Sequence, residues 1–196
     1  MFTGIVHGCG TVRAFIRRGK MHHLAVSLPK KFPSVKIGGS VAVDGACLTV
    51  VRREKGVLFF DVVAETVRKT GFSAFAEGTR VHLEPALKYN HRIEGHFVQG
   101  HVDGVGVVRK IVRQKSDLAL QLTFPAKLKH YIFSKGSVAV DGVSLTIGDV
   151  SGNRFWLYLI PHTLGRTHFV DLHVGSRVNL EADVLVKFFK TLNTSH

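Results

Sequence analysis

The sequence predicts an all-β protein: two tandem Greek-key β-barrels related by internal duplication, followed by a C-terminal amphipathic helix. Three observations predict this fold. The eleven residues SVAVDGACLTV at 40–50 return as SVAVDGVSLTI at 137–147. Each half contains short β-branched runs that are separated by glycine, proline and Asn/Asp clusters at intervals of about ten residues. The final segment, ADVLVKFFKTLN at 182–193, places its apolar residues at helical spacing.

The duplication covers almost the whole chain. ETVRKT at 65–70 and GTRVHLE at 78–84 return as HTLGRT and GSRVNLE, each 97 residues later, whereas the glycines that start at Gly4 return 96 residues later. A single inserted residue in so long a match indicates duplication rather than chance. We therefore expect a first barrel over residues 1–90, a second barrel over 91–183, and an oligomerisation helix over 184–196.

Each half is expected to consist of short strands with one short helix. A small closed or Greek-key barrel is the usual way in which an antiparallel sheet removes its exposed edges. The expected helices lie over residues 29–35 and 125–133. The expected strands lie over residues 24–28, 40–45, 47–51 and 57–63 in the first half, and over 118–124, 137–142, 144–150 and 155–160 in the second.

The C-terminal helix follows both barrels and carries an apolar face. Leu185, Phe188, Phe189 and Leu192 lie on that face at helical spacing. An apolar face of this kind requires a partner, and we expect the helix to pack against copies of itself in an oligomer. Folding back onto its own barrel is the alternative.

The composition restricts the partners and the location. Lys and Arg outnumber Asp and Glu by 27 to 14, but the basic residues occur as scattered pairs rather than as one basic run. They indicate a solvated surface rather than a nucleic-acid site. The N-terminus lacks the pattern of a signal peptide, and no stretch reaches the roughly 18 apolar residues of a membrane span. A cytoplasmic protein that contacts neither membrane nor nucleic acid is expected.

No metal site or hydrolase motif is predicted. Cys9 and Cys47 are the two cysteines, so neither a disulfide framework nor a CxxC site can form. The histidines at 22–23, 91, 96 and 101 lack cysteine or carboxylate partners at ligand spacing. A triad of Ser144, His101 and Asp141 lacks a nucleophile-elbow motif, and no P-loop or dinucleotide-binding motif is present.

The two halves differ most in their polar groups. Cys47 in the first half corresponds to Ser144 in the second, each with a threonine two residues later on the same strand face. Such donors and acceptors suit the edge of a pyrimidine- or pteridine-like ring. His101 is the candidate proton carrier because of its intrinsic pKa. The alternatives are a small buried hydrophobe for Cys47 and a plain surface histidine for His101.

Several motifs together resemble one known family. MFTGIV, CLTV, SLTI, ETVRKT, IPHTLGRT and above all GHFVQGHVDG at 95–104 closely resemble the trimeric, tandem-barrel riboflavin synthases. The resemblance implies a cofactor-independent dismutation, in which two molecules of 6,7-dimethyl-8-ribityllumazine give riboflavin and 5-amino-6-ribitylaminouracil. It also implies a homotrimer joined by the C-terminal helices, with each active site between the first barrel of one subunit and the second barrel of its neighbour. Lumazine synthase is a further candidate partner.

The resemblance also implies which residues bind substrate. Two identical substrates with different roles require two similar but chemically unequal pockets. The first lumazine is expected to contact Gly4, Ile5, Val6, Cys47, Leu48, Thr49, Asp61, Val62, Val63, Ala64, Glu65 and Thr66. The second is expected to contact Gly100, His101, Val102, Lys135, Asp141, Ser144, Leu145, Thr146, Leu159, Ile160, Pro161, His162 and Thr163.

The implied chemistry begins with the acidic 7-methyl group of the lumazine. One bound molecule loses a proton from this group, and the other is attacked at its C7. His101 is the candidate for proton transfer, and Phe2 is expected to close the pocket. The candidate nucleophiles or hydrogen-bond donors are Ser144, Thr146 and Cys47. Holding two flat rings face to face is worth roughly 7–11 kcal/mol of the barrier.

Two other functions remain open from the sequence. A non-catalytic lumazine- or flavin-binding protein, such as the fluorescent antenna proteins of the same fold, would lose the catalytic pattern in one half. Here CLT, SLT and the histidine of QGHVDG are all present. A basic barrel that binds nucleic acid is supported by the net charge alone and lacks an aromatic and basic surface motif.

Overall fold

The first half of the chain forms a closed barrel in the computed structural model, which describes residues 1–113 and 117–193. The strands are hydrogen-bonded in the order β1-β2-β5-β4-β3-β6, and β6 returns to pair with β1. This closure removes the sheet edges, as the strand pattern predicts. The strands are β1 (Gly8–Arg18), β2 (Met21–Ser27), β3 (Ser40–Val43), β4 (Ala46–Glu54), β5 (Val57–Val63) and β6 (Arg80–Pro85).

The second half repeats this strand order in a seven-stranded sheet, β10-β9-β13-β7-β8-β12-β11. The strand that corresponds to β4 is divided into β10 and β11. Gly148 N still donates to Trp156 O (2.8 Å), which joins the two edges. The fold class expected from the sequence is therefore confirmed. The strands are β7 (Gly104–Arg113), β8 (Leu118–Thr123), β9 (Ser137–Val140), β10 (Val143–Thr146), β11 (Val150–Ser151), β12 (Arg154–Leu159) and β13 (Arg177–Ala182).

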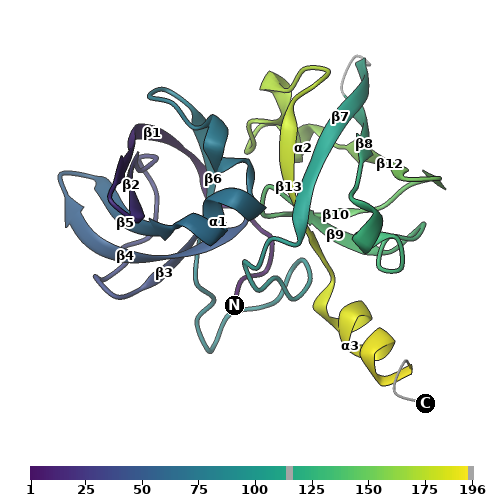
Figure 1. The fold of residues 1–196 in the computed structure, drawn as a ribbon, viewed down its shortest axis with the longest axis horizontal. Helices are drawn as coiled ribbons and strands as arrows, with labels where there is room; N and C mark the ends of the chain where they lie inside the picture. The colour runs from purple at the N-terminus through teal and green to yellow at the C-terminus, as the bar shows by residue number, and fades with distance from the viewer. Residues whose placement is uncertain (114–116, 194–196) are drawn as a thin grey trace.

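Each barrel encloses its own hydrophobic core, and a small third core lies between them. In β8, Leu118, Leu120 and Leu122 are buried while the residues between them are partly exposed, as strand alternation requires. Burial of one such side chain stabilises the fold by about 1.5–3 kcal/mol. Phe2 and Val98 form the third core together with Ala42 and Ala139. The two barrels lie side by side around this junction (Figure 1).

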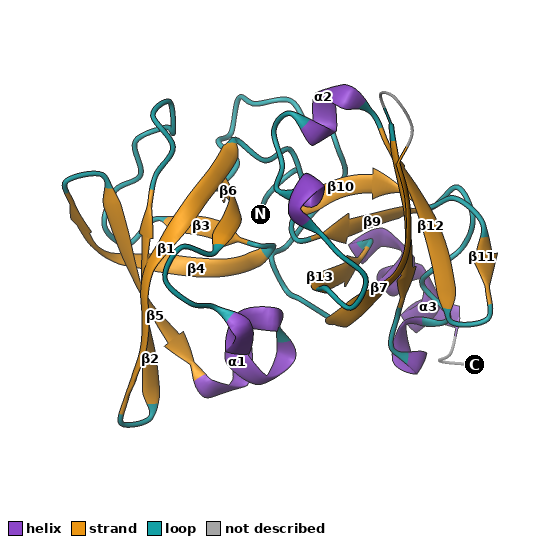
Figure 2. Cartoon of the chain, turned by 90° about the horizontal axis from the view of Figure 1, so that it is seen from above, coloured by secondary structure: helices purple, strands orange, loops and turns teal. Residues whose placement is uncertain are grey.

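The helices lie outside the sheets, and their positions correct one expectation (Figure 2). No helix forms over residues 29–35, because Pro33 lacks an amide hydrogen and disfavours a helical conformation at the preceding residue. The region 125–133 contains one 3₁₀ turn, η2 (Ala126–Leu128). The short α-helices α1 (Ala64–Lys69) and α2 (Pro161–Leu164) instead follow β5 and β12.

The C-terminal helix α3 (Val184–Asn193) forms as expected and projects from the second barrel (Figure 1). Residues 194–196 of the expected helix lie outside the described residues. The exposure of its side chains shows that the apolar face is not folded back on the barrel. Four apolar side chains of this face are 48–63% exposed: Leu185, Phe188, Phe189 and Leu192. Lys187 Nζ lies 2.8 Å from Asp103 Oδ2 and fixes the helix to the start of β7.

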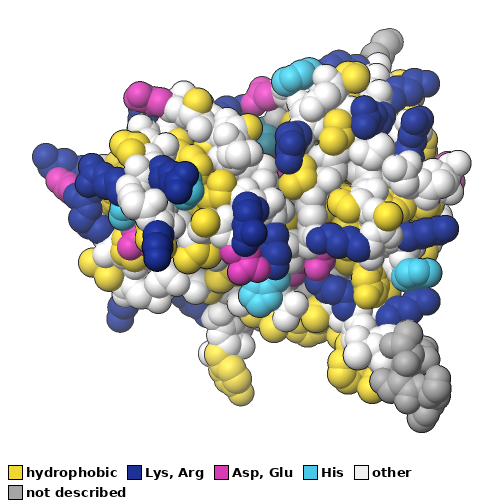
Figure 3. Space-filling model, in the orientation of Figure 1, with side chains coloured by type: hydrophobic (Ala, Val, Ile, Leu, Met, Phe, Trp, Pro, Cys, Tyr) yellow, Lys and Arg dark blue, Asp and Glu magenta, His cyan; other side chains and the backbone are white. Residues whose placement is uncertain are grey.

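Basic side chains are spread over both barrels on the face that Figure 3 shows, and no single dense stripe is visible there. This distribution agrees with the scattered pairs in the sequence. Among residues 1–113 and 117–193, no helix has the length and apolar character needed to cross a membrane.

Candidate active site

Two short segments cross at the junction of the barrels. Phe2 N donates to Val98 O (2.7 Å) and Val98 N donates to Phe2 O (3.1 Å), as in an antiparallel sheet. Phe2 is fully buried in this position. After crossing, the chain from Phe2 runs to the second barrel, whereas the chain from Val98 runs to the first.

The crossing exchanges the two glycine-containing segments. The carbonyl of Gly4 accepts a hydrogen bond from Ser144 N (2.8 Å), and the carbonyl of Gly100 accepts one from Cys47 N (2.8 Å). Both glycines have positive φ, and a Cβ on either would lie 2.6 Å from the Cβ of its serine or cysteine partner. Glycine is therefore required for this close approach.

The exchange corrects the grouping expected from the sequence. Gly4, Ile5 and Val6 were expected beside Cys47, and Gly100, His101 and Val102 beside Ser144. The structure reverses this, since Val6 packs in the second core and Val102 packs against the first. The reason is the antiparallel pairing of Phe2 with Val98, which directs each segment toward the opposite barrel.

A buried glutamate holds each exchanged segment. Glu84 accepts hydrogen bonds from Thr3 N (2.7 Å), Thr3 Oγ1 (2.8 Å) and Gly4 N (3.0 Å). At the corresponding position of β13, Glu181 accepts from the backbone N–H groups of Gln99, Gly100 and His101 at 2.7–3.0 Å. Burial raises the pKa of Glu181 to about 7, against the lowering effect of these hydrogen bonds.

A cavity of about 230 Å³ opens beside Cys47 in the first barrel. Its walls come from the start of β4, the end of β5, helix α1 and the exchanged segment. The lining residues are Ala46, Cys47, Val63, Glu65, Thr66, Lys69, Thr70, Gly100, His101 and Val102.

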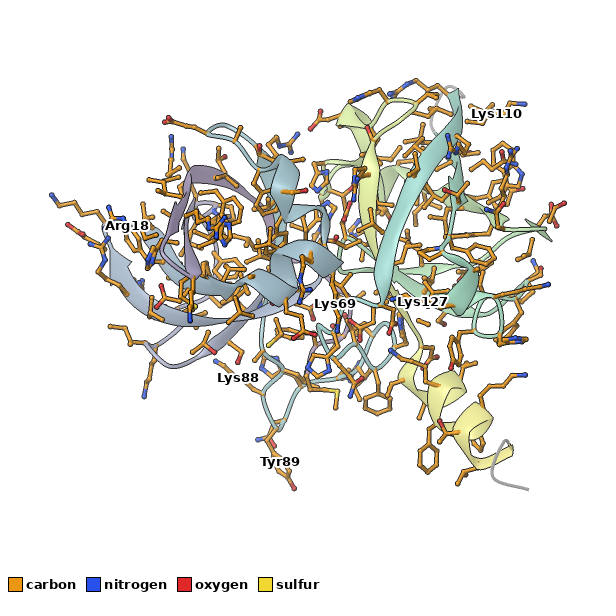
Figure 4. All side chains as sticks on the ribbon, viewed as in Figure 1. Arg18, Lys69, Lys88, Tyr89, Lys110 and Lys127 are labelled. Atoms are coloured by element: carbon orange, nitrogen blue, oxygen red, sulfur yellow. The ribbon has the colours of Figure 1, made fainter. Side chains whose placement is uncertain are left out.

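Lys69 gives this cavity a cation. Its Nζ lies 2.6 Å from Glu65 Oε1, and this pairing lowers the pKa of Glu65. Lys69 lies near the middle of the molecule, between the two barrels (Figure 4). Ala46, Lys69 and Thr70 were not among the predicted site residues. The positive charge shared by Lys69 and Arg166 in the two repeats was the available signal.

Ser144 in the second barrel has a histidine partner. His96 Nδ1 lies 2.7 Å from Ser144 Oγ, and His96 Nε2 is buried without a hydrogen-bond partner among residues 1–113 and 117–193. Burial lowers the pKa of His96, which favours the neutral imidazole, although the charge of Asp183 opposes this. A neutral imidazole beside a serine hydroxyl can accept its proton. From the sequence, His96 was considered only as a possible metal ligand, and its contact with Ser144 was not predicted.

The comparisons with known proteins agree with this geometry. The lumazine binding domain matches residues 3–86 and again residues 99–183. Riboflavin synthase of Photobacterium phosphoreum is 38% identical over 193 residues, covering 98% of this chain and 88% of that protein. The riboflavin synthase of Chlamydia trachomatis is 40% identical over 192 residues, covering 95% and 92%. The chain belongs to the riboflavin synthase family.

Solved structures with the same fold include complexes of a second protein, LumP. Its complex with riboflavin matches with a TM-score of 0.87 and 27% sequence identity, covering 93% of this chain and 99% of that one. Its complex with 6,7-dimethyl-8-(1'-D-ribityl) lumazine matches with a TM-score of 0.85, 27% identity and the same coverage. Family membership and these neighbours both support a binding site for a small-molecule substrate.

Some of the residues that were predicted to contact the lumazines point into the barrel cores. Neighbouring residues of a strand face opposite sides of the sheet, so a continuous run cannot place every side chain in a pocket. Their backbone groups alone remain available to a ligand. These residues are Leu48, Val62 and Leu159, which are buried, and Leu145, which packs partly buried against the second core.

Asp141 is also placed differently from its predicted role. It is buried at the junction of the barrels, where its Oδ1 accepts from Asn179 N (2.7 Å). Asp61 is exposed on β5 and pairs with His23 Nδ1 (2.7 Å). Both carboxylates are thus engaged by hydrogen bonds or ion pairs within the fold, and neither lines the cavity beside Cys47.

The other predicted residues lie at exposed strand ends and short helices. Ile5 is exposed and lines a larger cavity of about 690 Å³ beneath the connection between the barrels. Lys135 has positive φ and donates from its backbone N to Ile147 O (2.9 Å). The remaining residues are exposed or partly exposed: Thr49, Ala64, Thr146, Ile160, Pro161, His162 and Thr163.

Proposed function

We propose that this protein is a riboflavin synthase, a transferase that converts two molecules of 6,7-dimethyl-8-ribityllumazine into riboflavin and 5-amino-6-ribitylaminouracil. One observation supports this most strongly. Two corresponding positions, Cys47 and Ser144, each contact an exchanged glycine segment but carry different reactive groups. The site is thus duplicated in shape and unequal in chemistry, as a dismutation of two identical molecules requires.

The reaction transfers a four-carbon unit from one lumazine to the other. The acceptor loses a proton from its 7-methyl group, and new carbon–carbon bonds close the third ring of riboflavin. The donor loses the same carbons and leaves as the diaminouracil. Together the two products contain all the atoms of the two substrates, so the transfer needs no external oxidant or reductant.

The proposed roles of the side chains follow from their positions. His96 and Ser144 form a base and hydroxyl pair in the second barrel, while His101 stands beside Cys47 in the first cavity. Each pair can move a proton or stabilise a developing charge at the ring it contacts. Phe2 acts as a positioning residue, because its buried ring lies beside Gly100. Thr146 remains a candidate hydrogen-bond donor.

We also propose that the active site is shared between subunits of a homotrimer. The exposed apolar face of α3 supports association with copies of the same helix. In such a trimer, the first barrel of one subunit would face the second barrel of the next. The division of the chain into a first barrel (1–90), a second barrel (91–183) and an oligomerisation segment (184–196) is part of this proposal. The segments around Gly4 and Gly100 are exchanged between the two barrels. We further propose that the protein is located in the cytoplasm and associates with lumazine synthase.

A binding protein without catalysis is the second candidate, because LumP shares the fold at a TM-score of 0.87. Incubating the purified protein with 6,7-dimethyl-8-ribityllumazine, and following riboflavin by absorbance and fluorescence, distinguishes the two. Turnover with one diaminouracil per riboflavin supports the synthase. Tight binding of lumazine without turnover would support the binding protein and contradict the proposed activity.

A further inference from the structure

The junction of the barrels contains a second group of buried polar residues, besides the two glutamates that hold the exchanged segments. Asn179 on β13 uses its side-chain amide twice: Oδ1 accepts from Gly71 N (2.8 Å) and Nδ2 donates to Asp44 O (2.7 Å). His82 occupies the corresponding position on β6. Its Nε2 accepts from His168 N (2.9 Å), and its Nδ1 lies 2.9 Å from Asp141 O.

His82 therefore substitutes for an asparagine in the same pair of hydrogen bonds. An imidazole that accepts at Nε2 and donates at Nδ1 to a carbonyl is neutral. Burial and the neighbouring His168 lower the pKa of His82 well below its usual value, in agreement with this state. Both ring nitrogens are engaged by the backbone, so His82 is not available to bind a metal ion without losing a bond across the junction.

His168 adds a contact that its counterpart Gly71 cannot make. Its ring stacks on that of His82 with centroids 3.8 Å apart and an angle of 17°. Its Nε2 lies 3.2 Å from Asp44 Oδ1, which also accepts from His82 N (2.7 Å). His168, His82 and Asp44 are all buried. The first barrel thus supplies the carboxylate and one ring, and the second barrel supplies the other ring.

The charges around His168 favour its protonated form. Burial alone lowers the pKa of His168, but the charge and hydrogen bond of Asp44, together with Asp141, raise it to about 9. Arg80 also faces the group with a small opposing effect, and it is itself paired with Asp171 (2.7 Å). Burial and the charge of Asp44 raise the pKa of Asp141 well above its usual value.

Solvent reaches this group through a groove between the barrels. The groove has a volume of about 560 Å³, and Asp44, Asp141 and His168 lie among its lining residues. Two equivalent arginines, Arg80 on β6 and Arg177 on β13, also line it. Protons can therefore exchange with His168 while the barrels stay folded.

We propose that Asp44, His82 and His168 form a protonation-dependent clasp between the two barrels, closed while His168 carries a proton and weakened when it loses that proton. This inference does not depend on the proposed activity. Because the folded protein holds the proton more tightly than the unfolded chain, the stabilisation is complete below pH 6.5 and is lost as the pH rises through about 9. His82 acts in the opposite direction, and protonation below pH 6.5 opposes the clasp.

The first test is a titration of the native protein labelled with carbon-13 at the histidine Cε1 positions. One histidine resonance is expected to titrate near pH 9, and it should be missing from His168→Gln. This resonance should persist in His82→Asn, because Asn179 shows that asparagine can make the same backbone contacts. The absence of any histidine that titrates above pH 8 in the native protein would overturn the clasp.

The second test is the melting temperature from pH 6 to pH 10. The native protein should lose more thermal stability over this range than His168→Gly, which copies the Gly71 counterpart. Parallel curves for the two proteins would contradict the proposal. If His168→Gly does not fold, the titration of the native protein still decides the question.

Discussion

His96 Nδ1 lies 2.7 Å from Ser144 Oγ, so the hydroxyl of the second barrel has a base within hydrogen-bond distance. The corresponding Cys47 shares its cavity with His101. The two sites therefore differ in the nucleophilic atom, which is oxygen in one and sulfur in the other, and in the contact that a histidine makes with this atom. This difference supplies the chemical asymmetry that two identical substrates lack.

The first prediction concerns how much the Ser144 hydroxyl and the Cys47 thiol each contribute to the rate of catalysis. Replacing the hydroxyl or the thiol removes a donor but keeps both rings in place, and orientation supplies most of the acceleration. Ser144→Ala and Cys47→Ser should each lower kcat by no more than about 10²-fold. Steady-state formation of riboflavin measures the effect. A folded Ser144→Ala protein with no detectable turnover would contradict the assigned role.

The second prediction is the pH dependence of catalysis. Burial lowers the pKa of His96 from its ordinary 6.5, so the imidazole stays neutral until the pH falls below that value. The acidic limb of the kcat profile should therefore lie below pH 6.5. His96→Gln should remove this limb while preserving a hydrogen-bonding side chain. A limb centred above pH 6.5, or one that persists in His96→Gln, would show that another group titrates.

The third prediction separates backbone strain from contact between the barrels. Gly45 and Gly56 both have φ near 78°, but a Cβ on Gly45 would lie 2.6 Å from Gly142 N, whereas Gly56 has open space. Gly56→Ala should cost about 1–2 kcal/mol from the left-handed conformation alone. Gly45→Ala should cost about 1–3 kcal/mol more, because the junction must move. Urea denaturation gives both values, and equal losses would argue against a tight junction.

The fourth prediction concerns the oligomer. Phe188 and Phe189 are 59% and 63% exposed on α3, and an exposed apolar patch of this kind marks a site of protein association. Phe188→Ser combined with Phe189→Ser should convert a trimer into monomers in sedimentation experiments. Val174→Ser, which changes an equally exposed apolar side chain on the second barrel, is the control. Monomers of the native protein at micromolar concentration would contradict the role of α3.

The duplication makes much of the fold predictable from the sequence. The repeated offset and the alternation of apolar residues predict two similar barrels, and the helical spacing of Leu185, Phe188 and Phe189 predicts α3. The helix predicted over residues 29–35 does not form, because two prolines there oppose it. The short helices α1 and α2 form where the strands end, within repeats that carry no strong helical pattern of their own.

The exchange of the glycine segments could not be predicted, because its cause is not local. The residues around Gly4 and Gly100 match each other closely, so either segment could close either barrel on the basis of its own sequence. The pairing of Phe2 with Val98 and the path of the connecting chain decide between these arrangements. His96 was missed for a related reason, since it lies 48 residues from Ser144 in the sequence.

The most direct test of a shared active site uses two blocked variants. Thr66 lines the cavity of the first barrel, and Thr163 occupies the corresponding position beside the second. Thr66→Trp and Thr163→Trp should each inactivate the protein when prepared alone, by filling one of the two sites.

Mixing the two inactive variants under conditions that exchange subunits should then restore riboflavin synthesis. Each mixed trimer has one interface, of its three, that combines an intact first barrel from one chain with an intact second barrel from its neighbour; with random exchange of equal amounts, this is about a quarter of the interfaces over all trimers. We predict that the activity of the mixture rises toward that fraction of the activity of the native protein. Complete inactivity of the mixture, with mixed trimers demonstrated by mass spectrometry, would contradict a site formed between subunits.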